Sequence, residues 1–101
     1  MDEWDLDLGS GRMARFTNWS PDRALNPQYA GVPDIERYGL HVHHEGGCDG
    51  FVTFDSEVAR RFEPNTPRWT VESWEPLTLS PSILSQGCCH GFIREGKWVD
   101  G

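Results

Sequence analysis

Residues 77–99 read LTLSPSILSQGCCHGFIREGKWV, and the order of apolar and turn residues in this stretch predicts the structure of the C-terminal part of the chain. The Glu-Gly dipeptide between residues 91–94 and 97–99 is typical of a two-residue hairpin loop. A hairpin with this loop places Ile93 opposite Trp98 in the core, as an apolar cross-strand pair. The stretch therefore predicts an antiparallel C-terminal part.

Short strands are predicted along the rest of the chain, because apolar and polar residues alternate there with a period of two. These strands cover residues 1–8, 12–19, 38–44, 51–54, 68–74 and 77–79. One short helix is predicted at residues 56–62 with Asp55 as its cap, and Ser20 begins a further turn or two of helix. The expected fold class is α+β and β-rich, a small antiparallel sheet of hairpins with one short helix.

The length of 101 residues allows one domain and no second core. Residues 13–101 are expected to form a single compact β-rich domain around a tryptophan-rich core. Residues 1–12 form either an acidic N-terminal extension, in which case Met13 is the natural start, or an edge strand of that domain. The sequence indicates no oligomeric state.

The charge balance narrows the possible partners, since 16 acidic residues against 9 basic ones give a formal net charge of −7. A chain this acidic is not expected to bind nucleic acid or an anionic membrane directly. No apolar run approaches the ~20 residues of a membrane span, and no signal peptide opens the sequence. We therefore expect a cytoplasmic protein.

Soft metal ligands gather in two turns that lie far apart in the sequence. Cys88, Cys89 and His90 are consecutive, and His44 and Cys48 belong to the turn HVHHEGGCDG. Thiolates and imidazoles together suit tetrahedral zinc, and three cysteines in a reducing compartment favour ligands over a disulfide framework. Inert buried thiols and exposed histidines would explain the same residues without a metal.

Three other chemistries receive less support from the residues. The run His41-x-His43 is similar to that of metal-dependent hydrolases, but alternating histidines on a strand are commonly exposed polar residues, and whether they contribute to a metal site stays open. Cys89 is an unfavourable nucleophile for a base at His90, because neighbours on a strand point to opposite faces. The segment Ser80-Pro81-Ser82 lacks the glycines and the lysine of a phosphate-binding loop, so it is interpreted as a turn that ends a strand.

The tail motif SPSI, then Cys, then HGFIR-x-GKW resembles a family of small phage and prophage proteins of unknown function, and relatives of this group lie beside bacterial ubiquitin-like conjugation genes. The segments WSPDRALNPQY, VPDIERYG and WTVESWEPLTLSPSIL share the likeness, which spans residues 16–99. The resemblance implies a zinc site and a start at Met13, and it supplies no activity. Carried over residue by residue, it implies zinc ligands at His44, Cys48, His90 and either Cys88 or Cys89.

The expected function is that of a small phage-type accessory protein, a zinc-stabilised module that binds a host or phage protein. A zinc closed by four protein ligands leaves no position for water, so no residue is assigned a catalytic role and a binding protein is favoured over an enzyme. One alternative is a zinc-dependent hydrolase with Glu45 or Asp49 as its base. The other is an acidic inhibitor that mimics nucleic acid.

Overall fold

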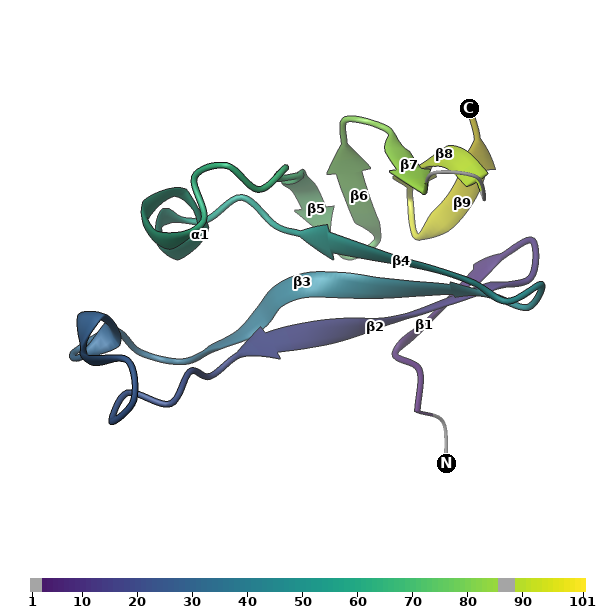
Figure 1. Ribbon diagram of the computed structural model, residues 1–101. Coiled ribbons are helices and arrows are strands. Elements are labelled where there is room, and N and C mark those ends of the chain that lie inside the picture. The colour runs from purple at the N-terminus through teal and green to yellow at the C-terminus, as the bar shows by residue number, and fades with distance from the viewer. Residues whose placement is uncertain (1–2, 86–88) are drawn as a thin grey trace.

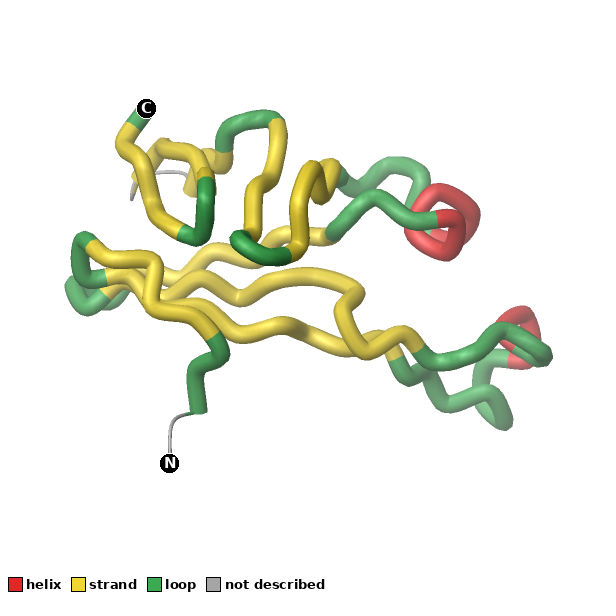
Figure 2. The backbone as a smooth tube through the Cα atoms, turned by 180° about the vertical axis from the view of Figure 1, so that it is seen from behind, coloured by secondary structure: helices red, strands yellow, loops and turns green. Residues whose placement is uncertain are grey.

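The computed structural model describes residues 3–85 and 89–101 and arranges them in two β layers (Figure 1). One layer is a four-stranded antiparallel sheet in the order β1-β2-β3-β4. Its strands are β1 (Leu6–Gly9), β2 (Arg12–Trp19), β3 (Ile35–His44) and β4 (Cys48–Thr53). The second layer contains two small antiparallel sheets, β5-β6 and β7-β8-β9, stacked on one face of the first layer (Figure 2). Its strands are β5 (Thr70–Trp74), β6 (Leu77–Ser80), β7 (Ile83–Ser85), β8 (Cys89–Arg94) and β9 (Lys97–Asp100).

The expected β-rich fold of antiparallel hairpins with one short helix is confirmed for the described residues. The alternation of apolar and polar residues explains why the larger sheet has one buried face: Leu40 and Val42 of β3 are buried, while His41 and His43 lie on the opposite face. Strand β3 begins three residues before its predicted start, since a register shift in β2 lets Trp19 pair with the Ile35 end of β3.

The hydrophobic core lies between the two layers. Its members share a relative exposure of 6% or less, and they come from both layers and from the segment after β4. They are Leu8, Ala14, Leu40, Val42, Val52, Phe54, Leu77, Leu79, Ile83, Ile93 and Trp98. Each small sheet is therefore stabilised by the apolar face that it buries against the larger one.

The predicted C-terminal hairpin is confirmed. Ile93 and Trp98 are cross-strand partners in β8 and β9, and their exposed fractions are 0% and 5%. Gly91 lies beneath this pair, and a Cβ atom built there would lie 2.5 Å from Cζ2 of Trp98. Because real Cβ atoms do not approach ring atoms so closely, glycine allows β8 to lie directly on the indole.

The predicted helix at residues 56–62 is confirmed as α1 (Glu57–Phe62), but its cap is Ser56 rather than Asp55. The Ser56 hydroxyl accepts a hydrogen bond from the backbone nitrogen of Ala59, at 3.0 Å. None of the helices within the described residues is long and apolar enough to span a membrane.

The helix predicted after Ser20 is wrong. Asp22 instead closes a turn, since its carboxylate accepts from the backbone nitrogens of Ala24 and Leu25 at 3.0 and 3.2 Å. Proline cannot donate the next helical hydrogen bond, and a single 3₁₀ turn, η1 (Pro27–Tyr29), follows.

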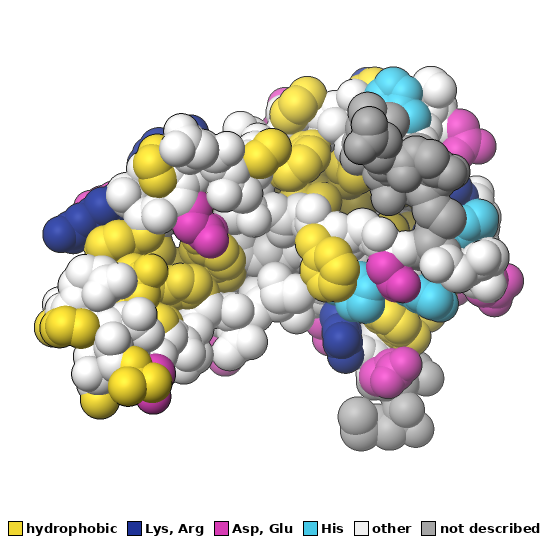
Figure 3. Space-filling view, viewed as in Figure 1, with side chains coloured by type: hydrophobic (Ala, Val, Ile, Leu, Met, Phe, Trp, Pro, Cys, Tyr) yellow, Lys and Arg dark blue, Asp and Glu magenta, His cyan; other side chains and the backbone are white. Residues whose placement is uncertain are grey.

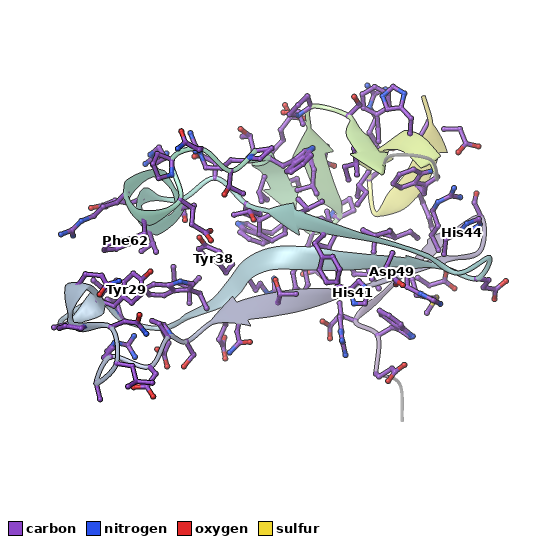
Figure 4. All side chains as sticks on the ribbon, in the orientation of Figure 1. Tyr29, Tyr38, His41, His44, Asp49 and Phe62 are labelled. Atoms are coloured by element: carbon purple, nitrogen blue, oxygen red, sulfur yellow. The ribbon has the colours of Figure 1, made fainter. Side chains whose placement is uncertain are left out.

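Aromatic rings join the η1 segment to α1 at one end of the molecule, where Figure 3 shows hydrophobic side chains gathered together. The rings of Tyr29 and Phe62 meet edge to face with centroids 4.8 Å apart (Figure 4). The ring of Trp19 stacks on that of Phe62 with centroids 6.3 Å apart. The hydroxyl of Tyr38 donates to the carboxylate of Glu63. Burial, followed by this carboxylate, raises the pKa of Tyr38 well above its usual range.

Candidate active site

The hairpin formed by β7 and β8 brings a serine and a histidine together on its outer face. Leu84 is the cross-strand partner of His90, so Ser82, two residues before Leu84, is the diagonal neighbour of His90 on the same face. The alternate residues Ile83 and Gly91 pair on the inner face, where both are buried. Because successive side chains alternate between the two faces of β7 and β8, the register of this pair places Ser82 and His90 together on the solvent-facing side.

Ser82 Oγ and His90 Nε2 lie 2.9 Å apart, within hydrogen-bond distance. In the tautomer that carries its ring proton on Nδ1, Nε2 accepts the hydroxyl proton of Ser82. A serine hydroxyl in contact with an imidazole is the arrangement that activates serine as a nucleophile, because the imidazole removes the proton as the oxygen attacks. His90 is exposed and Ser82 is half-buried, so a substrate can reach both side chains.

Hydrogen bonds to the main chain hold both residues in place. The indole Nε1 of Trp69 donates to the carbonyl oxygen of Ser82 at 3.1 Å. The backbone nitrogen of Gly101 donates to the carbonyl oxygen of His90 at 3.0 Å. Within residues 3–85 and 89–101, no carboxylate hydrogen bonds to the His90 ring, so the described geometry is that of a Ser-His dyad.

The predicted zinc ligands lie in different sheets. His44 ends β3 opposite the backbone of Cys48 in β4, whereas Cys89 and His90 begin β8. Cys88 lies outside the described residues, and of Cys48 and Cys89 only the backbone is described. In the part of the chain that is described, no three histidine, cysteine or carboxylate side chains are arranged so that they could hold a metal ion. Zinc therefore stays a prediction. Among the candidate ligands in the second layer, His90 is the one whose side chain is described, and it hydrogen bonds to Ser82.

The histidine run of β3 forms a separate cluster on the outer face of the larger sheet (Figure 4). His41 Nε2 and His43 Nδ1 each lie 2.8 Å from the same carboxylate oxygen of Asp49. Hydrogen bonds from His43 and then His41 lower the pKa of Asp49 below its usual value. Trp4 stacks on His43 and Phe51 on His41, with ring centroids 5.3 and 4.5 Å apart. Asp49 therefore lies in an ion-pair cluster on this outer face.

A groove of about 900 Å³ elsewhere on the described surface contains neither Ser82 nor His90. Phe16, Trp74 and Leu77 line it, and the Arg37 guanidinium lies over the Phe16 ring at 4.4 Å. Carboxylates of Asp5, Glu36 and Glu75 also line the groove, but no serine, threonine or cysteine does, so it pairs no nucleophile with a base as the exposed dyad does. The dyad is therefore the better candidate for an active site.

Ser82 is the residue of the dyad that sequence reasoning missed. Ser82 was interpreted as part of a turn, and His90 was paired with the neighbouring thiols. The signal that could have found the dyad is the spacing of the motif SPSI and the following histidine across one hairpin. Once residues 83–85 pair with 89–91, period-two alternation places Ser82 and His90 on one face.

Comparison with known families gives a match that covers both residues of the dyad. Residues 21–100 match the family model described as "Bacterial ubiquitination-like system serine protease (BubE)". Comparisons with curated proteins and with solved structures gave no match.

This match shows that the assignment to phage proteins of unknown function is wrong. It also corrects the expected function, which was a zinc-stabilised binding module, and its two alternatives, a zinc-dependent hydrolase and an acidic mimic of nucleic acid. The expectation was wrong because it rested on the thiols, while the described chemistry joins a hydroxyl to an imidazole. Because the match covers about four fifths of its length, this chain belongs to the BubE family, which is described as the serine protease of a bacterial ubiquitination-like system.

Proposed function

We propose that this chain is a serine protease of a bacterial ubiquitination-like system, with Ser82 as nucleophile and His90 as general base. The observation that carries the proposal is the 2.9 Å contact between Ser82 Oγ and His90 Nε2 on an exposed face. Membership of a family described as serine proteases supports the same assignment. The protein partner predicted from the sequence is then the substrate.

The proposed reaction is acyl transfer in two stages. Ser82 Oγ attacks the carbonyl carbon of the scissile amide while its proton moves to Nε2 of His90. The protonated imidazole then gives this proton to the leaving amine as the C–N bond breaks, which leaves an ester on Ser82. Water, deprotonated by His90, hydrolyses the ester, and the proton returns to the serine oxygen as the acid product leaves.

A fluorophosphonate probe tests the nucleophile without a known substrate. An activated serine oxygen displaces fluoride at phosphorus and keeps the phosphonyl group, whose position is read by mass spectrometry of the digested protein. We expect one adduct, on Ser82, and none in Ser82→Ala. His90→Ala should react about 10²–10⁴-fold more slowly, which is the usual contribution of a positioned base.

Ser80→Ala is the matched control, because Ser80 lies two residues earlier in the same segment and pairs with Thr70 in the β5-β6 sheet. It should react at the rate of the wild-type protein. Labelling that persists in Ser82→Ala, or a wild-type protein that takes up no probe, would disprove the proposed role of Ser82.

A further inference from the structure

Trp69 is fixed to the larger sheet through its main chain. Its backbone nitrogen donates to the carbonyl oxygen of Thr53 at 2.9 Å, and its carbonyl oxygen accepts from the nitrogen of Asp55 at 2.8 Å. These bonds form a parallel bridge between Trp69 and Phe54, just beyond the end of β4. Because Phe54 is a core residue with 2% exposure, the position of Trp69 is set by the core.

From this fixed position, the side chain of Trp69 reaches the other layer. The ring packs against the core cluster, and Nε1 donates to the carbonyl oxygen of Ser82 at 3.1 Å. The next residue, Ile83, is 5% exposed and anchors the start of β7 in the core. The peptide bond between Ser82 and Ile83 is therefore held by the Trp69 indole at its carbonyl oxygen and by the buried Ile83 at its other end.

We propose that Trp69 is a positioning residue for Ser82, an inference that rests on the proposed function of the dyad. Trp69 does not contact the reacting oxygen. It fixes the backbone from which Oγ projects, and the 2.9 Å approach of Oγ to His90 depends on that backbone. Misplacement of a nucleophile by about 1 Å can cost 10²-fold in rate, so the loss of one such hydrogen bond should cost about 10-fold.

Trp69→Phe tests this role, because it removes the indole N–H and keeps an aromatic ring at the same place. In the fluorophosphonate reaction, the maximal rate of inactivation should fall about 10-fold. The probe concentration for half-maximal rate should stay that of the wild-type protein, since Trp69 does not contact the probe site and probe binding is not altered. A purely structural loss would instead lower the fraction of protein that reacts and leave the rate of that fraction unchanged.

Trp74→Phe is the matched control in the adjoining strand β5. Its indole makes no hydrogen bond to the described residues, and its ring contacts Phe16 and Phe54 with a 46% exposed side chain. Its inactivation rate should equal that of the wild-type protein. Equal rates in Trp69→Phe and wild type, with Ser82 still labelled, would overturn the role of Trp69 alone. An unlabelled wild-type protein would overturn the proposed function and this inference together.

A measurement on the wild-type protein applies even if Trp69→Phe does not fold. In ¹H–¹⁵N spectra, phosphonylation of Ser82 should shift the indole N–H resonance of Trp69, because the two residues share the hydrogen bond at the Ser82 carbonyl. The indole resonance of Trp74 should stay in place. If the Trp69 resonance does not move while Ser82 is fully modified, the inference is wrong.

Discussion

Replacement of Trp98 by alanine should remove much of the stability of this domain. Trp98 is 5% exposed, and its indole packs against Gly91 in the centre of the C-terminal hairpin. A buried tryptophan removes about 150–250 Å² from water, which at ~25 cal/mol per Å² corresponds to roughly 4–6 kcal/mol. Measured Trp-to-Ala changes in cores cost about 3–5 kcal/mol.

Two polar contacts increase the cost. The Arg12 guanidinium lies over the Trp98 ring, 4.5 Å from its centroid, and the indole Nε1 donates to Asp100 at 2.8 Å. A cation–π contact contributes about 0.5–2 kcal/mol, and Arg12 is only 8% exposed, so this contact is shielded from water. We therefore expect Trp98→Ala to lower the free energy of unfolding by about 4–6 kcal/mol, against the ~5–15 kcal/mol usual for a domain.

Urea unfolding followed by circular dichroism measures this loss, with Trp74→Ala as control. Trp74 is 46% exposed, so by the same area argument its replacement should cost about half as much, roughly 2–3 kcal/mol. If Trp98→Ala unfolds cooperatively with a loss below about 1.5 kcal/mol, the indole does not carry the core contacts assigned to it.

Two further changes test other parts of the fold. Ser56→Ala removes the cap of α1 and should lower the free energy of unfolding in urea by about 0.5–2 kcal/mol. Ser56→Asn should keep most of this stability, because asparagine also caps helices. An unchanged unfolding midpoint in Ser56→Ala would contradict the capping role. Asp49→Asn removes a carboxylate whose pKa is lowered by hydrogen bonds from His43 and His41. A lowered folded-state pKa gives stability that is present above the unfolded pKa of ~3.9 and is lost as the pH falls through the folded value. The difference in melting temperature between wild type and Asp49→Asn should therefore be largest above about pH 4 and shrink below it, and a difference that grows on acidification would refute this sign.

Local patterns were sufficient to predict most strands and the one α-helix. The C-terminal hairpin follows from the Glu-Gly loop and from apolar residues at positions 93 and 98, because both signals agree on one register. The segment after Ser20 was mispredicted, since the same Ser-Pro-Asp start suits a helix or an Asx turn, and only the hydrogen bonds of Asp22 decide between them. The stacking of the two layers could not be read from local pattern, because it depends on which apolar faces meet.

The candidate site was harder to predict than the fold. Cysteines and histidines close in sequence suggested a metal, and that signal is local. The contact between Ser82 and His90 depends instead on the pairing of residues 83–85 with 89–91. A serine gives no compositional signal of its own, so its role becomes visible only when the register of the hairpin is known.

Register is also what allows so short a hairpin to hold the proposed nucleophile beside its base. A slip of one residue between β7 and β8 would turn Ser82 or His90 toward the core and expose an apolar residue in its place. The slip is opposed by Ile83 and by Gly91, since only glycine at that position lets β8 lie on the Trp98 ring. The same contacts that bury the inner face therefore set the distance between the two polar side chains on the outer face, so changes in the core beneath β8 should alter the reactivity of Ser82 before they unfold the domain.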